Sequence, residues 1–142
     1  MIDVPRDDKV LLLETGYIYL AMGKFSEAKQ VFEGVSVLMP ESEIPLAGLA
    51  NVYFAQKKFL QAIRTLKEAL KLNEQSAFVK AHLGEAYLFY GKKDDAVEEL
   101  KAALSLDKDG HAGAFAKALL QLIDEGYDPV KFSKESANQA TA

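Results

Sequence analysis

A spacing of 34 residues dominates this sequence. Gly16, Ala50 and Gly84 lie 34 residues apart, and the same interval separates three further columns: Tyr19, Tyr53 and Tyr87; Ala28, Ala62 and Ala96; Phe32, Leu66 and Leu100. A fixed interval of this length is typical of a chain built from stacked copies of one supersecondary unit. The interval predicts three units, over residues 9–42, 43–76 and 77–110.

Each unit is predicted to be two helices joined by a tight turn. Apolar residues recur at helical spacing in both halves, and the break falls near Gly23, Lys57 or Gly91. Glycine readily takes the left-handed backbone that ends a helix. The small residues of the columns let the two helices approach closely, and the large ones fill the space beside them. Four residues are candidate N-caps: Ser26, Ser42, Ser76 and Asp94.

The residues beyond the third unit predict a closing helix and a tail. Phe115, Leu119 and Ile123 recur at helical spacing before Gly126, so residues 111–126 are expected to form a helix that caps the open end of the stack. Residues 1–126 then make a single domain. In the tail, 127–142, residues 127–132 are expected to be extended, and residues 133–142 to be disordered because they have no large apolar side chain to bury.

Charge and composition exclude several classes of partner. Seventeen basic against twenty-one acidic residues give a net charge of −4, which disfavours nucleic acid. No apolar run approaches the roughly 20 residues that cross a bilayer, so no membrane insertion is expected. The absence of cysteine and of a recognisable signal peptide favours a cytoplasmic location.

Catalytic and metal-binding patterns are lacking. His82 and His111 have no second histidine or carboxylate at a spacing that converges on a metal. The segment 107–110 resembles the start of a calcium loop, but its glycine comes early and Ala118 stands where a glutamate ligand is needed. An inter-repeat turn explains the segment better. We therefore expect no enzyme activity, no metal and no cofactor.

The pattern resembles the tetratricopeptide repeat family over about residues 9–110. Leu12, Gly16 and Tyr19, followed by Ala28, Phe32 and Pro40, carry the resemblance in the first unit, and the other two units repeat most of it without the family's common tryptophan. The resemblance implies an all-α fold, a right-handed superhelical stack of three helix-turn-helix repeats plus a C-terminal capping helix. It also implies that the first helices of the repeats line a concave face that binds partner peptides.

A second apolar stripe follows the first helix of each unit, in addition to the one that packs the hairpin. Ten of its twelve residues are apolar or aromatic, and a helix that is apolar nearly all round must be buried by something. The resemblance places the stripe on the concave face, although about half of it is expected to pack within the stack. The predicted groove residues are Val10, Leu13, Tyr17, Leu20, Ile44, Ala47, Asn51, Phe54, Phe78, Ala81, Glu85 and Leu88.

The chemistry of the stripe favours an apolar ligand. Relatives that clamp the acidic tails of heat-shock chaperones use lysine or arginine on this face, whereas the corresponding columns here are Leu13, Ala47 and Ala81, then Glu14, Gly48 and His82. Only Asn51 is similar to a clamp residue. We therefore predict that the groove binds an apolar extended or helical segment of another protein.

Two functions agree with such a groove. The size of the chain and the apolar groove resemble those of the dedicated chaperones of bacterial type III secretion systems, which would make the chain a module that shields a partner. The alternative is a structural or scaffold protein whose apolar face is an oligomer or assembly interface, with the chain forming a homo-oligomer. The mass in solution separates the two.

Overall fold

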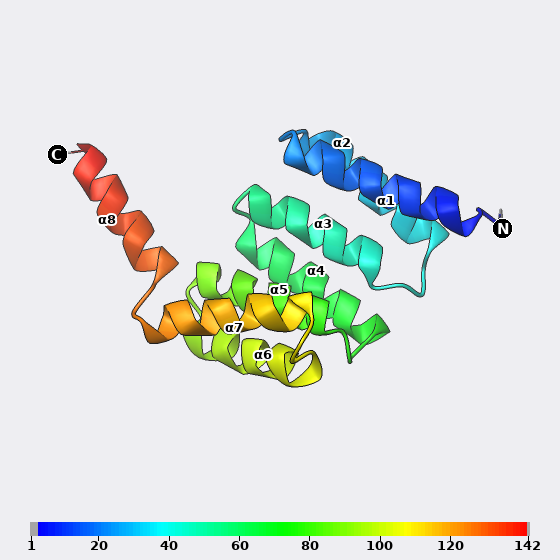
Figure 1. Ribbon diagram of the computed structural model, residues 1–142. Coiled ribbons are helices and arrows are strands. Elements are labelled where there is room, and N and C mark those ends of the chain that lie inside the picture. Colours follow the sequence, from blue (N-terminus) through cyan, green and yellow to red (C-terminus); the bar gives the residue numbers. More distant parts are fainter. Residues whose placement is uncertain (1–2, 142) are drawn as a thin grey trace. The chain divides into compact units, whose positions relative to one another are not determined.

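The computed structural model describes residues 3–141, and every regular element in that range is an α-helix (Figure 1). The helices fall into two compact units, Met1–Glu74 and Gln75–Ala142. The first unit holds α1 (Arg6–Ala21), α2 (Phe25–Leu38), α3 (Ile44–Ala55) and α4 (Phe59–Leu72); the second holds α5 (Ala77–Tyr90), α6 (Lys93–Leu106), α7 (His111–Asp124) and α8 (Pro129–Thr141). The predicted all-helical fold is confirmed, and each predicted repeat contains one pair of helices.

The same backbone turn closes all three hairpins. Gly23, Lys57 and Gly91 have φ of 73°, 62° and 96°, and the N–H of each donates to the carbonyl three residues earlier. The N–H of the following lysine donates to the carbonyl of Tyr19, Tyr53 or Tyr87 at 2.8–2.9 Å. This pair of bonds satisfies carbonyls that the end of a helix would leave without partners. Lys57 adopts the left-handed backbone without being glycine, at a cost of roughly 1–2 kcal/mol.

Three of the four predicted N-caps are wrong. The residue before α3 is Glu43 and not Ser42, and it makes no side-chain cap, although Ser42 Oγ accepts a hydrogen bond from the Ile44 N–H at 3.2 Å. Helices α2 and α6 begin one residue before Ser26 and Asp94, and neither helix has a side-chain cap. The turn itself explains the difference, because the residue before each helix is the lysine whose N–H closes the turn, and a lysine side chain has no acceptor for a helix N–H. Ser76, in contrast, caps α5 as predicted, with its Oγ accepting a hydrogen bond from the Val79 N–H at 3.2 Å.

The core of the first unit forms around the Phe32 side chain. Helix α2 packs against α1 and α3, and Phe32 is fully buried together with Ala28 and Val52. A Cβ added to Gly16 would lie 2.8 Å from the Phe32 ring, and one added to Gly48 would overlap the ring outright. The absence of side chains at these two glycines therefore lets α1 and α3 close on the ring.

The second unit repeats this packing around Leu100. A Cβ on Gly84 of α5 would lie 2.6 Å from the Leu100 side chain of α6. Helix α7 packs on both α5 and α6, and buries Leu119 and Ile123. The Asp107 carboxylate accepts a hydrogen bond from the Gly113 N–H at 3.2 Å, so segment 107–110 forms the turn before α7. The small and large columns predicted for the hairpins thus occupy the expected packing positions in both units.

The C-terminal segment differs from the prediction. Helix α8 spans Pro129–Thr141, where an extended segment and a disordered tail were expected; Ala142 lies outside the described residues. The Asp128 carboxylate accepts hydrogen bonds from the Val130 and Lys131 N–H groups at 3.0 and 3.2 Å, and proline suits the first turn of a helix. Pro129 is buried and Val130 is half-buried, whereas side chains 131–139 are all exposed, so only the first residues of α8 gain stability from burial.

Candidate functional site

In the first unit, the predicted stripe lies on α1 and α3, which contact each other directly (Figure 1). Helix α1 contributes Val10, Leu13, Tyr17 and Leu20, and α3 contributes Ile44, Ala47, Asn51 and Phe54. The helical repeat of 3.6 residues brings each set onto one side of its helix. The packing of α1 on α3 then brings the two sets together.

A polar pair lies within this mostly apolar face. The side chains of Tyr17 and Asn51 are hydrogen-bonded, and the Tyr17 ring meets the Phe32 ring edge-on with centroids 5.0 Å apart. Burial raises the pKa of Tyr17, and the hydrogen bond with Asn51 acts in the opposite direction. Asn51 therefore joins α1 to α3 by satisfying a half-buried hydroxyl.

The apolar residues around this pair differ in exposure. Val10 and Ile44 each expose 44% of their surface, and Phe54 is half-buried with its ring 5.2 Å from the Phe59 ring. Leu13 and Leu20 pack against the Phe32 cluster and are half-buried. Ala47 is fully buried and belongs to the core. We define the α1–α3 face as Val10, Leu13, Tyr17, Ile44, Asn51 and Phe54.

In the second unit, the stripe is divided between core and surface. Leu88 exposes only 3% of its surface and Ala81 is buried, so neither can contact a ligand in this conformation. Phe78 is exposed, and Glu85 is half-buried. Leu88 therefore stabilises the unit and does not act as the anchor that the stripe predicted.

Two further residues complete the surface beside Phe78. The His82 ring lies 4.5 Å from the Phe78 ring and 5.2 Å from the Phe115 ring of α7, and His82 Nδ1 lies 3.6 Å from Glu85 Oε1. The stripe predicted from the sequence ends at the third repeat and does not include Phe115. Phe115 lies 34 residues after Ala81, so extending the repeat interval by one more unit would have predicted it as a residue of the stripe.

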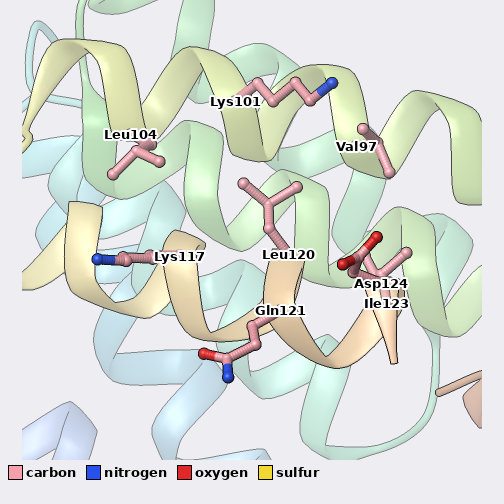
Figure 2. A pocket seen from close by; sticks show the side chains of 8 residues that line it. All are labelled: Val97, Lys101, Leu104, Lys117, Leu120, Gln121, Ile123 and Asp124. Atoms are coloured by element: carbon pink, nitrogen blue, oxygen red, sulfur yellow. The ribbon is translucent and has the colours of Figure 1, made fainter. Parts of the chain in front are cut away.

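A hollow of about 510 Å³ lies between α6 and α7 (Figure 2). Leu120 points from α7 toward α6, between residues of both helices, and the complete lining is Val97, Lys101, Leu104, Lys117, Leu120, Gln121, Ile123 and Asp124. Outside the lining of this hollow, Ala118 and Leu122 of α7 are also exposed, although their equivalents Gly84 and Leu88 are buried in α5. The face of α7 that a second helix would cover is therefore open.

Helix α8 is chemically unsuited to cover that face. Counted from the glycine of the preceding turn, Lys131 and Glu135 of α8 occupy the positions of Ala96 and Leu100 in α6. Two charged side chains thus replace the small and large residues on which hairpin packing depends. This substitution explains why α8, which contacts α5, does not complete a fourth hairpin with α7.

The described residues contain no group of three or more histidine, aspartate or glutamate side chains placed to hold a metal ion. Over the same residues, no helix combines the length and apolar character needed to span a membrane.

Comparisons with known proteins agree with this architecture. The tetratricopeptide repeat profile matches residues 53–123, half of the chain, and a second profile of the same description matches residues 11–35. None of the curated proteins compared with this sequence matches it significantly.

Three solved structures illustrate the likeness of fold. PcrH, known from Pseudomonas aeruginosa, in complex with the chaperone binding region of PopB is 19% identical, with a TM-score of 0.71 over 83% of this chain and 96% of that chain. The Yersinia enterocolitica type III secretion translocator chaperone SycD is 21% identical, with a TM-score of 0.72 over 94% and 99%. The first such repeat domain of Spaghetti (RPAP3), bound to the HSP90 peptide SRMEEVD, is 23% identical, with a TM-score of 0.69 over 84% and 99%.

Proposed function

This chain belongs to the tetratricopeptide repeat family, and we propose that it is a protein-interaction module that holds an apolar extended or helical segment of a partner polypeptide on the α1–α3 face. The observation that carries the proposal is the composition of that face. Val10 and Ile44 remain 44% exposed on adjacent helices, beside the hydrogen-bonded pair of Tyr17 and Asn51. A mostly apolar surface with one polar pair suits a segment that buries side chains and aligns one backbone group.

The charge of the face separates this ligand from an acidic one. The HSP90 peptide bound by the Spaghetti (RPAP3) domain contains two glutamates and an aspartate. None of the six residues of the α1–α3 face is lysine or arginine, so the face has no cation to pair with such a peptide. Fully burying one apolar anchor contributes about 1.5–3 kcal/mol, and three or four anchors offset the cost of ordering a short segment.

A more specific proposal is that the chain is a chaperone of a type III secretion system, acting in the cytoplasm before its partner is secreted. PcrH with the PopB chaperone binding region, and the translocator chaperone SycD, share this fold over nearly their whole length. The apolar α1–α3 face supports the same role, because a segment destined for another environment needs its apolar residues shielded from water.

Site-specific photo-crosslinking in the native cell tests the binding face. Benzoylphenylalanine placed at Ile44 should capture one partner polypeptide, whereas the same group at Leu60 of α4, which is 39% exposed, should not. Mass spectrometry of the captured product then identifies the partner segment. Equal capture at both positions would show nonspecific contact, and capture at Leu60 alone would move the binding surface to α4.

The competing scaffold role predicts another product. If the α1–α3 face pairs with a second copy, the polypeptide captured at Ile44 will be this chain itself. A light-scattering mass should then fall from a multiple of 15.6 kDa to 15.6 kDa when Ile44 is replaced by glutamate.

A further inference from the structure

One acidic side chain of the second unit stands among aromatic rings. Glu85 lies one turn of α5 after His82, and Phe78 lies one turn before it, so the three side chains share one side of the helix. The centroid of the His82 ring lies 4.5 Å from that of Phe78 and 5.2 Å from that of Phe115 on α7. We call Phe78, His82, Glu85 and Phe115 the Glu85 site; all four residues belong to the second unit.

The Glu85 carboxylate is mostly shielded from water, and no lysine or arginine of the described chain balances it. Its side chain is 20% exposed, and the one ionisable group within ion-pair distance is His82, whose Nδ1 lies 3.6 Å from Glu85 Oε1. That distance is too long for a hydrogen bond, and His82 Nδ1 has no hydrogen-bond partner among the described residues. Lys80 of the same helix pairs with Glu99 of α6 instead. Shielding a charge without a paired opposite charge is costly.

The repeat register shows why the unit itself supplies no match for this acid. Glu85 stands in the column of Tyr17 and Asn51, whose side chains are hydrogen-bonded to each other in the first unit. The next member of the column, Leu119 of α7, is apolar and buried, so it offers no polar group to Glu85. The column thus holds a satisfied polar pair in the first unit and an acid without an equivalent partner in the second.

We propose that the Glu85 site binds an arginine side chain of the partner segment, an inference that rests on the proposed function and extends it. A carboxylate accepts two parallel hydrogen bonds from a guanidinium group, and the flat face of that group stacks on aromatic rings. Phe78 is 42% exposed and Phe115 is half-buried, so both rings present surface to a ligand. Lysine suits the site less well, because its ammonium group is strongly hydrated and cannot form the parallel pair.

The same charge selects against acidic segments. An aspartate or glutamate of a ligand at the Glu85 site would bring two carboxylates together where water screens them poorly, and like charges repel strongly in such a place. The apolar α1–α3 face rewards the burial of apolar side chains, whereas Glu85 selects the sign of the charge. The partner segment is therefore expected to be apolar and to carry at least one arginine.

The competing arrangement is an internal ion pair between Glu85 and His82, and thermal unfolding separates the two. If the carboxylate has its partner inside the chain, Glu85→Gln removes a stabilising interaction. If the carboxylate awaits a ligand, Glu85→Gln removes the cost of shielding a charge, and the melting temperature should stay unchanged or rise. Glu98→Gln on α6, where the side chain is exposed, is the matched control for the loss of one negative charge. A melting temperature several degrees lower for Glu85→Gln than for Glu98→Gln would overturn the proposal.

Peptide selection tests the ligand itself. A phage-displayed library of short random peptides is selected on the wild-type chain and on its variants, and sequencing gives the enrichment of each residue type. The wild type and Glu98→Gln should enrich peptides that combine apolar residues with arginine. Glu85→Gln should keep the apolar enrichment and lose that of arginine, and Glu85→Lys should favour aspartate or glutamate instead. An arginine-containing peptide selected on the wild type should bind Glu85→Gln roughly tenfold more weakly or worse.

The outcomes distinguish this inference from the proposed function. Apolar enrichment without arginine in the wild type, or arginine enrichment that persists in Glu85→Gln, would overturn the assignment of the Glu85 site and leave the proposed peptide binding intact. Arginine enrichment that depends on Glu85 but comes without apolar residues would support the Glu85 site and contradict an apolar ligand on the α1–α3 face. A wild-type chain that enriches no residue type would contradict both.

Discussion

The closest packing in the first unit can be tested with one methyl group. Gly48 of α3 lies directly on the Phe32 ring, and a Cβ there would overlap ring carbons of a fully buried side chain. The tip of the ring is confined as well, because a Cβ on Gly16 of α1 would lie 2.8 Å from Phe32 Cζ. Gly48→Ala must therefore push α3 away from α2 or force Phe32 off its rotamer.

Two opposing effects determine how much stability Gly48→Ala loses. Replacing glycine by alanine inside a helix stabilises it by about 1 kcal/mol, whereas overpacking a close-packed core costs about 1–3 kcal/mol. Because the ring is fully buried and both glycines approach it closely, we take the upper end of that cost and expect Gly48→Ala to lower the unfolding free energy by about 2 kcal/mol. Gly34→Ala on α2 is the matched control: its Cβ meets no atom within 4 Å, so the protein should gain up to about 1 kcal/mol.

Urea unfolding followed by helical circular dichroism measures both variants. The Phe32→Leu background then tests the cause, because the smaller side chain makes room for the methyl and should remove about half of the Gly48→Ala loss. If Gly48→Ala is as stable as Gly34→Ala, the ring can move aside, and glycine is not required for the close approach of α3 to α2.

Four further outcomes follow from burial and charge. Leu88→Glu should unfold the second unit, because it places a charge in the core. Ile44→Glu should leave the melting temperature within a few degrees and weaken partner binding at least tenfold, about 1.4 kcal/mol. Equal stability of the two variants would contradict the assignment of Leu88 to the core and Ile44 to the surface. Truncation after Asp109 should cause aggregation in light scattering, and a soluble product with unchanged melting would show that α7 is not required. Deleting residues 133–142 should not change the melting temperature, because side chains 131–139 are exposed. The raised pKa of Tyr17 favours its neutral form in the folded state, so this contribution to stability is present below pH 10 and is lost as pH rises through the raised pKa. Between pH 9 and pH 11, urea unfolding should therefore show a smaller loss of unfolding free energy for Tyr17→Phe than for the wild type. An equal loss in the two proteins would contradict the burial of the Tyr17 hydroxyl.

The repeat arithmetic predicted the hairpins because their packing depends on a few positions. Gly16 and Phe32 meet in one hairpin, and Gly84 and Leu100 meet in another, at the columns that the 34-residue interval defined. The interval also predicted the turns at Gly23 and Gly91. It could not show that α2 and α6 begin without side-chain caps, because that depends on how the turn bonds lead into the next helix.

The candidate site was predicted less completely, because a stripe on a helix records which residues are apolar and not which neighbour covers them. Leu88 and Ile44 fit the stripe equally well, yet one is buried and the other is nearly half exposed. Helix α8 was missed because Asp128 and Pro129 form a local start that needs no hydrophobic pattern.

The most direct test of the binding account is an amide chemical-shift titration of the isotope-labelled protein with a synthetic peptide. The peptide is the segment captured by the photo-crosslinker at Ile44. The account predicts that the largest shifts fall on α1 and α3, centred on Val10, Ile44 and Asn51, and that the Asn51 side-chain amide moves with them. Shifts confined to α2 and α4, or a peptide that shifts no resonance of α1 or α3, would contradict the claim that the α1–α3 face holds the partner.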